Sequence, residues 1–226
     1  MKYKALLLDI DNTLYNYNTP HACAKKSVVS YCATKFNIKE SVISSSYNQA
    51  RIKVHQDLHE TAASHNRLLY FQNMCERLAI NPTKNSLKLY DIYWNNFLEN
   101  MVPFKGVYEL LKKYQNKICL VTDLTAHIQF RKIEKLKLNE YCQALVTSEE
   151  AGKEKPNPIM FRLALQKLNL KPSEVCMIGD NFEKDVLGAN SLNIDTIWFN
   201  HEENQDSYSD STIKEARTFK KILDFV

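Results

Sequence analysis

Five short runs of apolar, β-prone residues are spaced along this chain, and their order constrains the fold more than any other feature. They read KALLLDI, KICLVTD, QALVTS, EVCMIGD and DTIWFN, beginning at residues 4, 117, 143, 174 and 195. Near-continuous hydrophobicity is typical of strands covered on both faces, as in a parallel sheet. Segments with helical periodicity at 107–115, 126–138, 158–169 and 183–192 alternate with the last four runs. This alternation predicts an α/β fold: a Rossmann-like, doubly wound parallel sheet of about five strands.

About a hundred residues without a strand-like run separate the first strand from the second. They show helical periodicity at 20–36, 40–57, 66–79 and 84–99, and Asn81-Pro82 marks the last break. Helices inserted after the first strand predict a lid-like subdomain at the sheet edge where α/β proteins bind ligands. We therefore expect an α/β core domain of residues 1–17 and 101–226, and a helical cap domain of residues 18–100.

Acidic residues follow three of the predicted strands. Asp9 and Asp11 end the first, Asp123 ends LVTD, and Asp180, with Asp185 nearby, ends MIGD. The carboxyl ends of parallel strands share one edge, so these acids are expected to crowd one crevice and repel each other. A divalent cation offsets that repulsion, and a ligand set with oxygen donors alone favours Mg²⁺.

Two further residues add positive charge and a hydroxyl donor to this edge. Lys155 lies in GKEKPNP, where the proline after it favours extended backbone, and Thr122 ends a strand just before a helix. Carboxylates, a hard metal, a lysine and a hydroxyl together are suited to phosphoryl transfer. A carboxylate can then act as nucleophile and form an aspartyl-phosphate.

The chain resembles the haloacid dehalogenase-like hydrolases, and the resemblance rests on four motifs in order. DIDNT at 9–13 is similar to the family's D-x-D-x-T, and VTD at 121–123 to its Ser/Thr after a strand. KP at 155–156 is similar to its lysine motif, and GDNFEKD at 179–185 to G-D-x-x-x-x-D. The inserted helices resemble the family's cap of the first type.

The resemblance implies a role for each residue of the phosphoryl site. Asp9 would be the nucleophile and a Mg²⁺ ligand. Asp11 would be general acid and then base, with its backbone carbonyl on the metal. Thr122 and Lys155 would hold the phosphoryl group. Because Asp9 and Asp11 need opposite protonation states, their crowding is expected to help keep one of the two protonated.

The remaining two acids are implied to serve the metal. Asp180 would be a ligand, and Asp185 would bind through water or orient Lys155. One position departs from the family pattern: Asp123 and Leu124 stand where relatives often have Asn and Gly. A carboxylate aimed at a phosphoryl group is unfavourable, so we expect Asp123 to face away from it.

The inserted helices and the loop after DIDNT hold candidate substrate contacts. His65 and Arg67 lie at an expected loop-to-helix junction and are polar enough to contact a leaving group. Helix capping by Ser64 or Asn66, with solvent-facing neighbours, is the competing interpretation. Tyr15 is expected either to line the leaving-group pocket or to pack against its surroundings. A metal site at His55 and His59 lacks a third ligand and is disfavoured.

Composition excludes several classes of protein. The formal charge of +4 is dispersed, without the basic–aromatic patterns of nucleic-acid-binding modules. No apolar run approaches the roughly 20 residues of a membrane span. The six cysteines fit no zinc spacing, and those inside strand runs are typical of reduced, buried thiols. A cytoplasmic protein, monomeric or homodimeric, is expected.

These observations favour a Mg²⁺-dependent phosphatase that hydrolyses a small phosphorylated metabolite, a sugar phosphate or nucleoside monophosphate. A phosphomutase that uses the same aspartyl-phosphate remains an alternative, as does a non-catalytic binding module. Dehalogenation is disfavoured because it does not need the acid at Asp11.

Overall fold

The computed structural model describes residues 2–202 and 212–226, and its contacts group into two compact units. The core unit comprises Met1–Asn16 and Val102–Val226, and the cap unit comprises Tyr17–Met101. The division predicted from the sequence differs from these contact-based units by one residue at each junction. Independent folding of either part remains a prediction.

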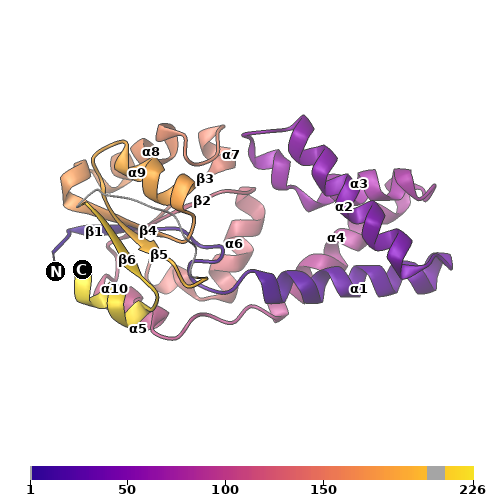
Figure 1. Ribbon diagram of the computed structural model, residues 1–226, viewed down its shortest axis with the longest axis horizontal. Helices are drawn as coiled ribbons and strands as arrows, with labels where there is room; N and C mark the ends of the chain where they lie inside the picture. Colours follow the sequence, from indigo (N-terminus) through magenta and orange to yellow (C-terminus); the bar gives the residue numbers. More distant parts are fainter. Residues whose placement is uncertain (1, 203–211) are drawn as a thin grey trace. The chain divides into compact units, whose positions relative to one another are not determined.

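A six-stranded, all-parallel sheet forms the centre of the core unit (Figure 1). Its order is β3-β2-β1-β4-β5-β6. The strands are β1 (Ala5–Leu8), β2 (Ile118–Thr122), β3 (Ala144–Thr147), β4 (Val175–Gly179), β5 (Asp195–Phe199) and β6 (Ile213–Ala216). The first five coincide with the apolar runs. The sixth, IKEA, was not expected, because an edge strand with two half-buried polar residues lacks the continuous hydrophobicity of the others.

Helices cover both faces of this sheet. They are α5 (Val107–Lys113), α6 (Ala126–Lys135), α7 (Ser148–Ala151), α8 (Pro158–Leu168), α9 (Gly188–Asn190) and α10 (Phe219–Phe225). The lower and upper layers of Figure 1 hold α5 with α10 and α8 with α9. Residues Met160, Phe161 and Ala164 of α8 pack on apolar side chains of β1, β2 and β4. The helix expected at 183–192 is instead a π-helical segment, Phe182–Leu187, continued by α9.

The cap unit contains only helices among its described elements. These are α1 (Asn18–Phe36), α2 (Glu40–Asp57), the short 3-10 segment Ala62–His65, α3 (Arg67–Arg77) and α4 (Pro82–Glu99). Asn66 and Asn81 accept backbone N–H bonds at the starts of α3 and α4, and Pro82 opens α4. These are the residue types that favour helix starts. Buried aromatic side chains fill the interior: Tyr47, Tyr70, Phe71, Tyr93, Trp94 and Phe97.

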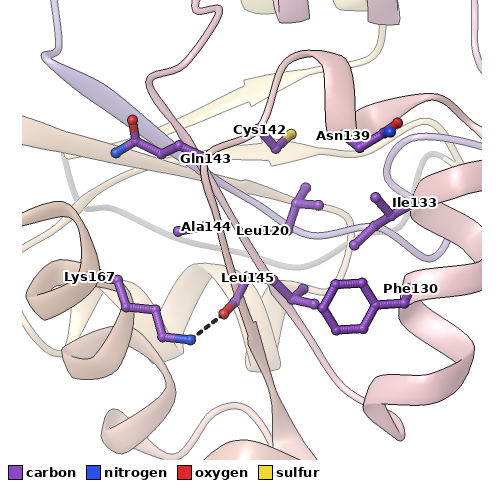
Figure 2. Close-up of a pocket in the computed structure, with 9 residues that line it drawn as sticks. All are labelled: Leu120, Phe130, Ile133, Asn139, Cys142, Gln143, Ala144, Leu145 and Lys167. Atoms are coloured by element: carbon purple, nitrogen blue, oxygen red, sulfur yellow. Dashed lines mark hydrogen bonds between the residues drawn. The ribbon is translucent and has the colours of Figure 1, made fainter.

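A pocket of about 560 Å³ lies beside the edge strand β3 (Figure 2). Its lining contains no acidic residue and includes Leu120, Phe130 and Lys167. The Lys167 ammonium donates to the Leu145 carbonyl at 2.5 Å, which occupies one exposed backbone acceptor of this edge. The pocket therefore holds none of the residues of the predicted site.

The cysteines and the hydropathy of the helices were the remaining features considered from composition. All six cysteines have free thiols, and Cys119 and Cys176 are buried in β2 and β4. Within the described residues, no helix combines the length and hydropathy that crossing a membrane requires.

Candidate active site

The acidic crevice forms where β1 and β4 end side by side. The register pairs Leu8 with Ile178, and the Asp9 amide donates to the Ile178 carbonyl at 3.0 Å. Asp9 and Asp180 are therefore brought to one edge of the sheet. Carboxylate oxygens of Asp9, Asp180 and Asp185 all lie within 4.8 Å of one another. Two of the three strand ends that carry acids, those of β1 and β4, supply this cluster, and Asp123 at the end of β2 is not part of it.

Lys155 ties this cluster to the neighbouring strand. Its ammonium lies 2.6 Å from Asp9 Oδ1, 2.6 Å from Asp185 Oδ1 and 3.1 Å from the Val121 carbonyl. Burial alone would lower the pKa of Lys155, but the Asp185 and Asp9 carboxylates raise it well above its usual value. The ammonium is therefore a permanent positive charge beside Asp9.

Thr13, the threonine of DIDNT, bonds to two of the clustered aspartates. Its buried hydroxyl lies 2.9 Å from Asp9 Oδ2 and 3.0 Å from Asp180 Oδ1, and it accepts from the Asp180 amide at 3.0 Å. The motif threonine therefore links the loops after β1 and β4. Asn12 adds a second link, because its amide donates to Asp180 Oδ2 at 3.0 Å.

The Asp185 carboxylate lies against Gly179, the glycine of GDNFEKD. It accepts hydrogen bonds from the Asn181 backbone N–H at 3.1 Å and from the Lys155 ammonium. A Cβ atom at Gly179 would lie 2.3 Å from Asp185 Oδ2. Only glycine leaves room for this carboxylate, which explains the spacing of the motif's first and last residues.

Asp11 is held by Tyr15 and by two residues that the sequence interpretation missed, Gln129 and Lys132. Lys132 of α6 lies 2.6 Å from both Asp11 oxygens, the Tyr15 hydroxyl donates to Oδ1, and the Gln129 amide donates to Oδ2 at 3.3 Å. Lys132 is only 1% exposed. Its position on the buried face of a helix beginning just after VTD was the available signal, but nothing in that pattern distinguishes a buried lysine from a solvated one.

The pKa values of the two motif aspartates shift in opposite directions. Burial would raise the pKa of Asp11, but Lys132, Tyr15 and Gln129 together lower it below its usual range. Burial raises the pKa of Asp9 to about 7, against the lowering effect of Lys155. Without a metal ion, therefore, Asp11 is the more readily ionised of the two, and Asp9 is the one whose pKa the neighbouring Asp11 carboxylate helps to raise.

Thr122 is the last residue of β2, and only 1% of it is exposed. Its hydroxyl accepts from the Gln129 amide at 2.8 Å, and Gln129 also donates to Asp11 and to the Asp123 carbonyl. Thr122 does not cap the following helix, because α6 begins after Thr125. Gln129 therefore orients both Thr122 and Asp11.

Asp123 uses both carboxylate oxygens within the core unit. Oδ1 accepts from the Lys155 backbone amide at 3.0 Å, and Oδ2 pairs with Lys184 at 2.9 Å. Leu124, where the resemblance places glycine, has a left-handed backbone with φ of 96°. The Leu124 backbone amide donates to the Ser148 hydroxyl at 2.9 Å, and this hydrogen bond supports the left-handed conformation.

The acidic cluster has the donor set and the electrostatics of a hard-cation site. Burial, with repulsion between neighbouring carboxylates, raises the pKa of Asp180 to about 7 and that of Asp185 to about 6. Asp9 has the similar rise given above. Lys155 supplies one positive charge beside these three carboxylates. The cluster therefore carries excess negative charge on oxygen ligands, which suits binding of Mg²⁺.

The predicted substrate residues fall into different units. Tyr15 is fully buried in the core unit and bonded to Asp11. His65 ends the 3-10 segment of the cap unit, and Arg67 begins α3 after the capping residue Asn66. The capping alternative is thus correct for Asn66, but Arg67 is buried rather than solvent-facing.

Comparisons with known proteins agree with this geometry. The family model "Haloacid dehalogenase-like hydrolase" matches residues 6–199. The chain is 36% identical to the ribulose-1,5-bisphosphate 5-phosphatase of Halopiger xanaduensis, over 90% of this chain and 87% of that protein. It is 27% identical to the pyrimidine 5′-nucleotidase YjjG of Escherichia coli, over 99% of both chains.

A solved structure extends the agreement to the fold. The putative hydrolase YfnB of Bacillus subtilis, bound to magnesium, matches with a TM-score of 0.71 and 16% identity, over 100% of this chain and 99% of that one. The ordered motifs, the sheet edge and these matches lead to one conclusion. The chain belongs to the haloacid dehalogenase-like hydrolases, and it is an enzyme of their phosphatase type.

Proposed function

We propose that this enzyme is a Mg²⁺-dependent phosphatase that hydrolyses a small phosphomonoester through an aspartyl-phosphate on Asp9. The observation that carries the proposal is Lys155, whose ammonium joins Asp9 and Asp185 at 2.6 Å each within the acidic cluster. A nucleophilic carboxylate flanked by a fixed cation is the arrangement that attack on an anionic phosphoryl group needs.

The residues of the chain divide the work as follows. Asp9 attacks phosphorus, and Thr13 and Lys155 hold its carboxylate in place. Lys155 and Thr122 bind the phosphoryl oxygens. Because the pKa of Asp11 is low, Asp11 must take up a proton before it can act as the acid, and Asp9 must lose its own, which the charge of Mg²⁺ would favour. Asp11 then gives its proton to the leaving oxygen and later takes one from the attacking water. Asp9, Asp180 and the Asp11 carbonyl would hold Mg²⁺, and Asp185 orients Lys155. The ion would supply positive charge at the transferring group.

The relatives guide the choice of substrate class. One acts on a sugar bisphosphate and one on pyrimidine 5′-nucleotides, by their names. We propose a sugar phosphate or a nucleoside monophosphate, with Tyr15, His65 and Arg67 as leaving-group contacts.

A direct assay tests the proposal. The purified protein should hydrolyse p-nitrophenyl phosphate with Mg²⁺ and lose that activity in EDTA, with recovery when Mg²⁺ is restored. A panel of phosphorylated sugars and nucleotides should then identify substrates by kcat/KM. Absence of Mg²⁺-dependent phosphate release from every compound would contradict the proposal and favour a binding module. Transfer of phosphate within a sugar, without release, would indicate a mutase.

A further inference from the structure

The cap unit contains a buried guanidinium at the start of α3. Arg67 is 6% exposed. One terminal nitrogen donates to the His65 carbonyl at 2.7 Å, and the other contacts the Tyr17 hydroxyl. The Nε atom is buried and has no hydrogen-bond partner among the described residues. Of its five N–H donors, the side chain therefore commits only some to the protein.

Aromatic rings surround this cation. The guanidinium carbon lies 5.2 Å from the ring centre of Tyr70, 5.7 Å from that of Tyr93 and 5.6 Å from that of Trp94. Rings stabilise a cation through their faces, but they carry no net charge. They hold the side chain in place without neutralising it.

No carboxylate of the cap unit neutralises Arg67. The acids of this unit, Glu40, Asp57, Glu60, Glu76, Asp91 and Glu99, are all exposed. Within the described part of the chain, Arg67 forms no ion pair. Burying a charge without an ionic partner is costly, and native proteins usually pair such charges. The missing partner is the feature that requires an explanation.

Nearby groups make the same region positive. Burial, followed by the positive charges of Arg67, Arg51 and Lys25, lowers the pKa of His21 to about 4. His21 is thus held neutral, and its Nδ1 lies 2.7 Å from the Tyr93 hydroxyl. The surroundings of Arg67 therefore contain several cations and no buried anion. A negatively charged ligand is the group that this arrangement favours.

We propose that Arg67 binds a carboxylate or phosphate group of a small molecule within the cap unit. A guanidinium presents parallel N–H donors that match two oxygens of either group. The anion has two possible sources, a second anionic group of the substrate itself or a separate ligand. The first source rests on the proposed phosphatase function, and it predicts that substrates with two anionic groups are preferred.

A matched pair of substrates tests the proposal. We expect wild-type kcat/KM to be at least about tenfold higher for 3-phosphoglycerate than for glycerol 1-phosphate, because the former adds a carboxylate. Arg67→Met should bring that ratio close to one. Arg77→Met is the control: it removes an exposed arginine of the same helix that donates to Gln49, and it should keep the wild-type ratio.

A second arm distinguishes the two sources of the anion. Succinate is added to the glycerol 1-phosphate assay at constant free Mg²⁺. A separate ligand site predicts that succinate changes kcat/KM in the wild type and not in Arg67→Met. If the anion belongs to the substrate, succinate leaves glycerol 1-phosphate hydrolysis unaltered or only weakens the preference for 3-phosphoglycerate.

The outcomes that overturn the proposal are specific. With no succinate effect, a wild-type ratio near one contradicts it, as does an equal ratio in the Arg67 and Arg77 variants. If Arg67→Met does not fold in a thermal melt, the neutral polar variant Arg67→Gln replaces it, and an unchanged ratio there has the same meaning. Hydrolysis of p-nitrophenyl phosphate in the wild type reports the proposed function separately.

Discussion

At the scale of single residues, the central feature is the different environment of the two aspartates in DIDNT. Asp9 is held by Lys155 and Thr13, whereas Asp11 is held by Lys132, Tyr15 and Gln129. The two carboxylates are two positions apart in sequence but have separate sets of partners. Separate partners allow one to act as nucleophile while the other transfers protons.

Replacing Lys132 with methionine should impair Asp11 more than it impairs the fold. The change removes the ion pair at 2.6 Å that orients the Asp11 carboxylate. We expect kcat to fall by roughly tenfold or more, toward the range for lost acid–base catalysis, with a smaller change in KM. Steady-state kinetics with a poor leaving group measures this.

The controls for Lys132 lie in the same helix. Lys132→Arg should recover much of the lost kcat because it restores the charge. Lys135→Met removes an exposed lysine one turn further along and should leave kcat near wild type. Equal kcat for the Lys132→Met and Lys135→Met variants would rule out a positioning role.

Asp11→Asn should lower kcat by roughly 10²–10⁴-fold, the range for loss of a general acid–base group. The loss should be smaller for p-nitrophenyl phosphate than for an alkyl phosphate, because a good leaving group needs less protonation. Comparing the two substrates with the variant and the wild type provides the measurement. An equal loss for both would mean that Asp11 serves only the metal.

At the scale of elements, the loop after β4 and the π-helical segment Phe182–Leu187 bring Asp180 and Asp185 to the crevice. Gly179 permits this approach. Gly179→Ala should displace Asp185, because the new Cβ would lie 2.3 Å from its carboxylate oxygen. Lys155 would then lose one of its two ion pairs.

We expect Gly179→Ala to lower both the melting temperature and kcat, which thermal denaturation and steady-state assays measure. Gly152→Ala is the control, since nothing lies within 4 Å of its added Cβ, although its φ is +71°. Its cost should be limited to backbone strain, roughly 1 kcal/mol, with kcat within about twofold of wild type. A Gly179 variant that behaves like the Gly152 variant would contradict the role given to this glycine.

The sequence predicted those helices and strands whose pattern of apolar residues follows directly from which of their faces are buried. Continuous apolar runs predicted β1 to β5, and 3.6-residue periodicity predicted the cap helices to within three residues at their ends. β6 escaped notice because it lies at the edge of the sheet beside β5, and its two half-buried polar residues interrupt the apolar pattern. Likewise, Lys132 and Gln129 lie in an ordinary amphipathic helix, and only the tertiary structure shows that they contact Asp11 and Thr122.

At the scale of the whole molecule, the acidic cluster couples stability to pH and to metal. The pKa of Asp9 and of Asp180 is about 7 and that of Asp185 about 6, above the value near 4 of an exposed aspartate. The folded, metal-free protein therefore binds protons that the unfolded chain has released. Its stability should fall as pH rises from about 4 to about 7.

A bound divalent cation replaces those protons, so Mg²⁺ should stabilise the protein more at pH 8 than at pH 5. Thermal denaturation with Mg²⁺ or with EDTA at both pH values measures the difference. Asp180→Asn should reduce the gain, and Asp57→Asn, which changes an exposed acid of the cap unit, should not. A gain in melting temperature that is equal at both pH values would contradict this coupling.

The most direct test of the account is the identity of the phosphorylated residue. Rapid-quench experiments with a ³²P-labelled substrate, followed by peptide mapping, should find acid-stable label on Asp9 in the wild-type protein. Asp9→Asn should carry no label and show no turnover, although its fold, measured by circular dichroism, and its Mg²⁺-dependent substrate binding should be largely retained. Label on any other residue, or label on the Asp9→Asn protein, would contradict the assignment of Asp9 as the nucleophile.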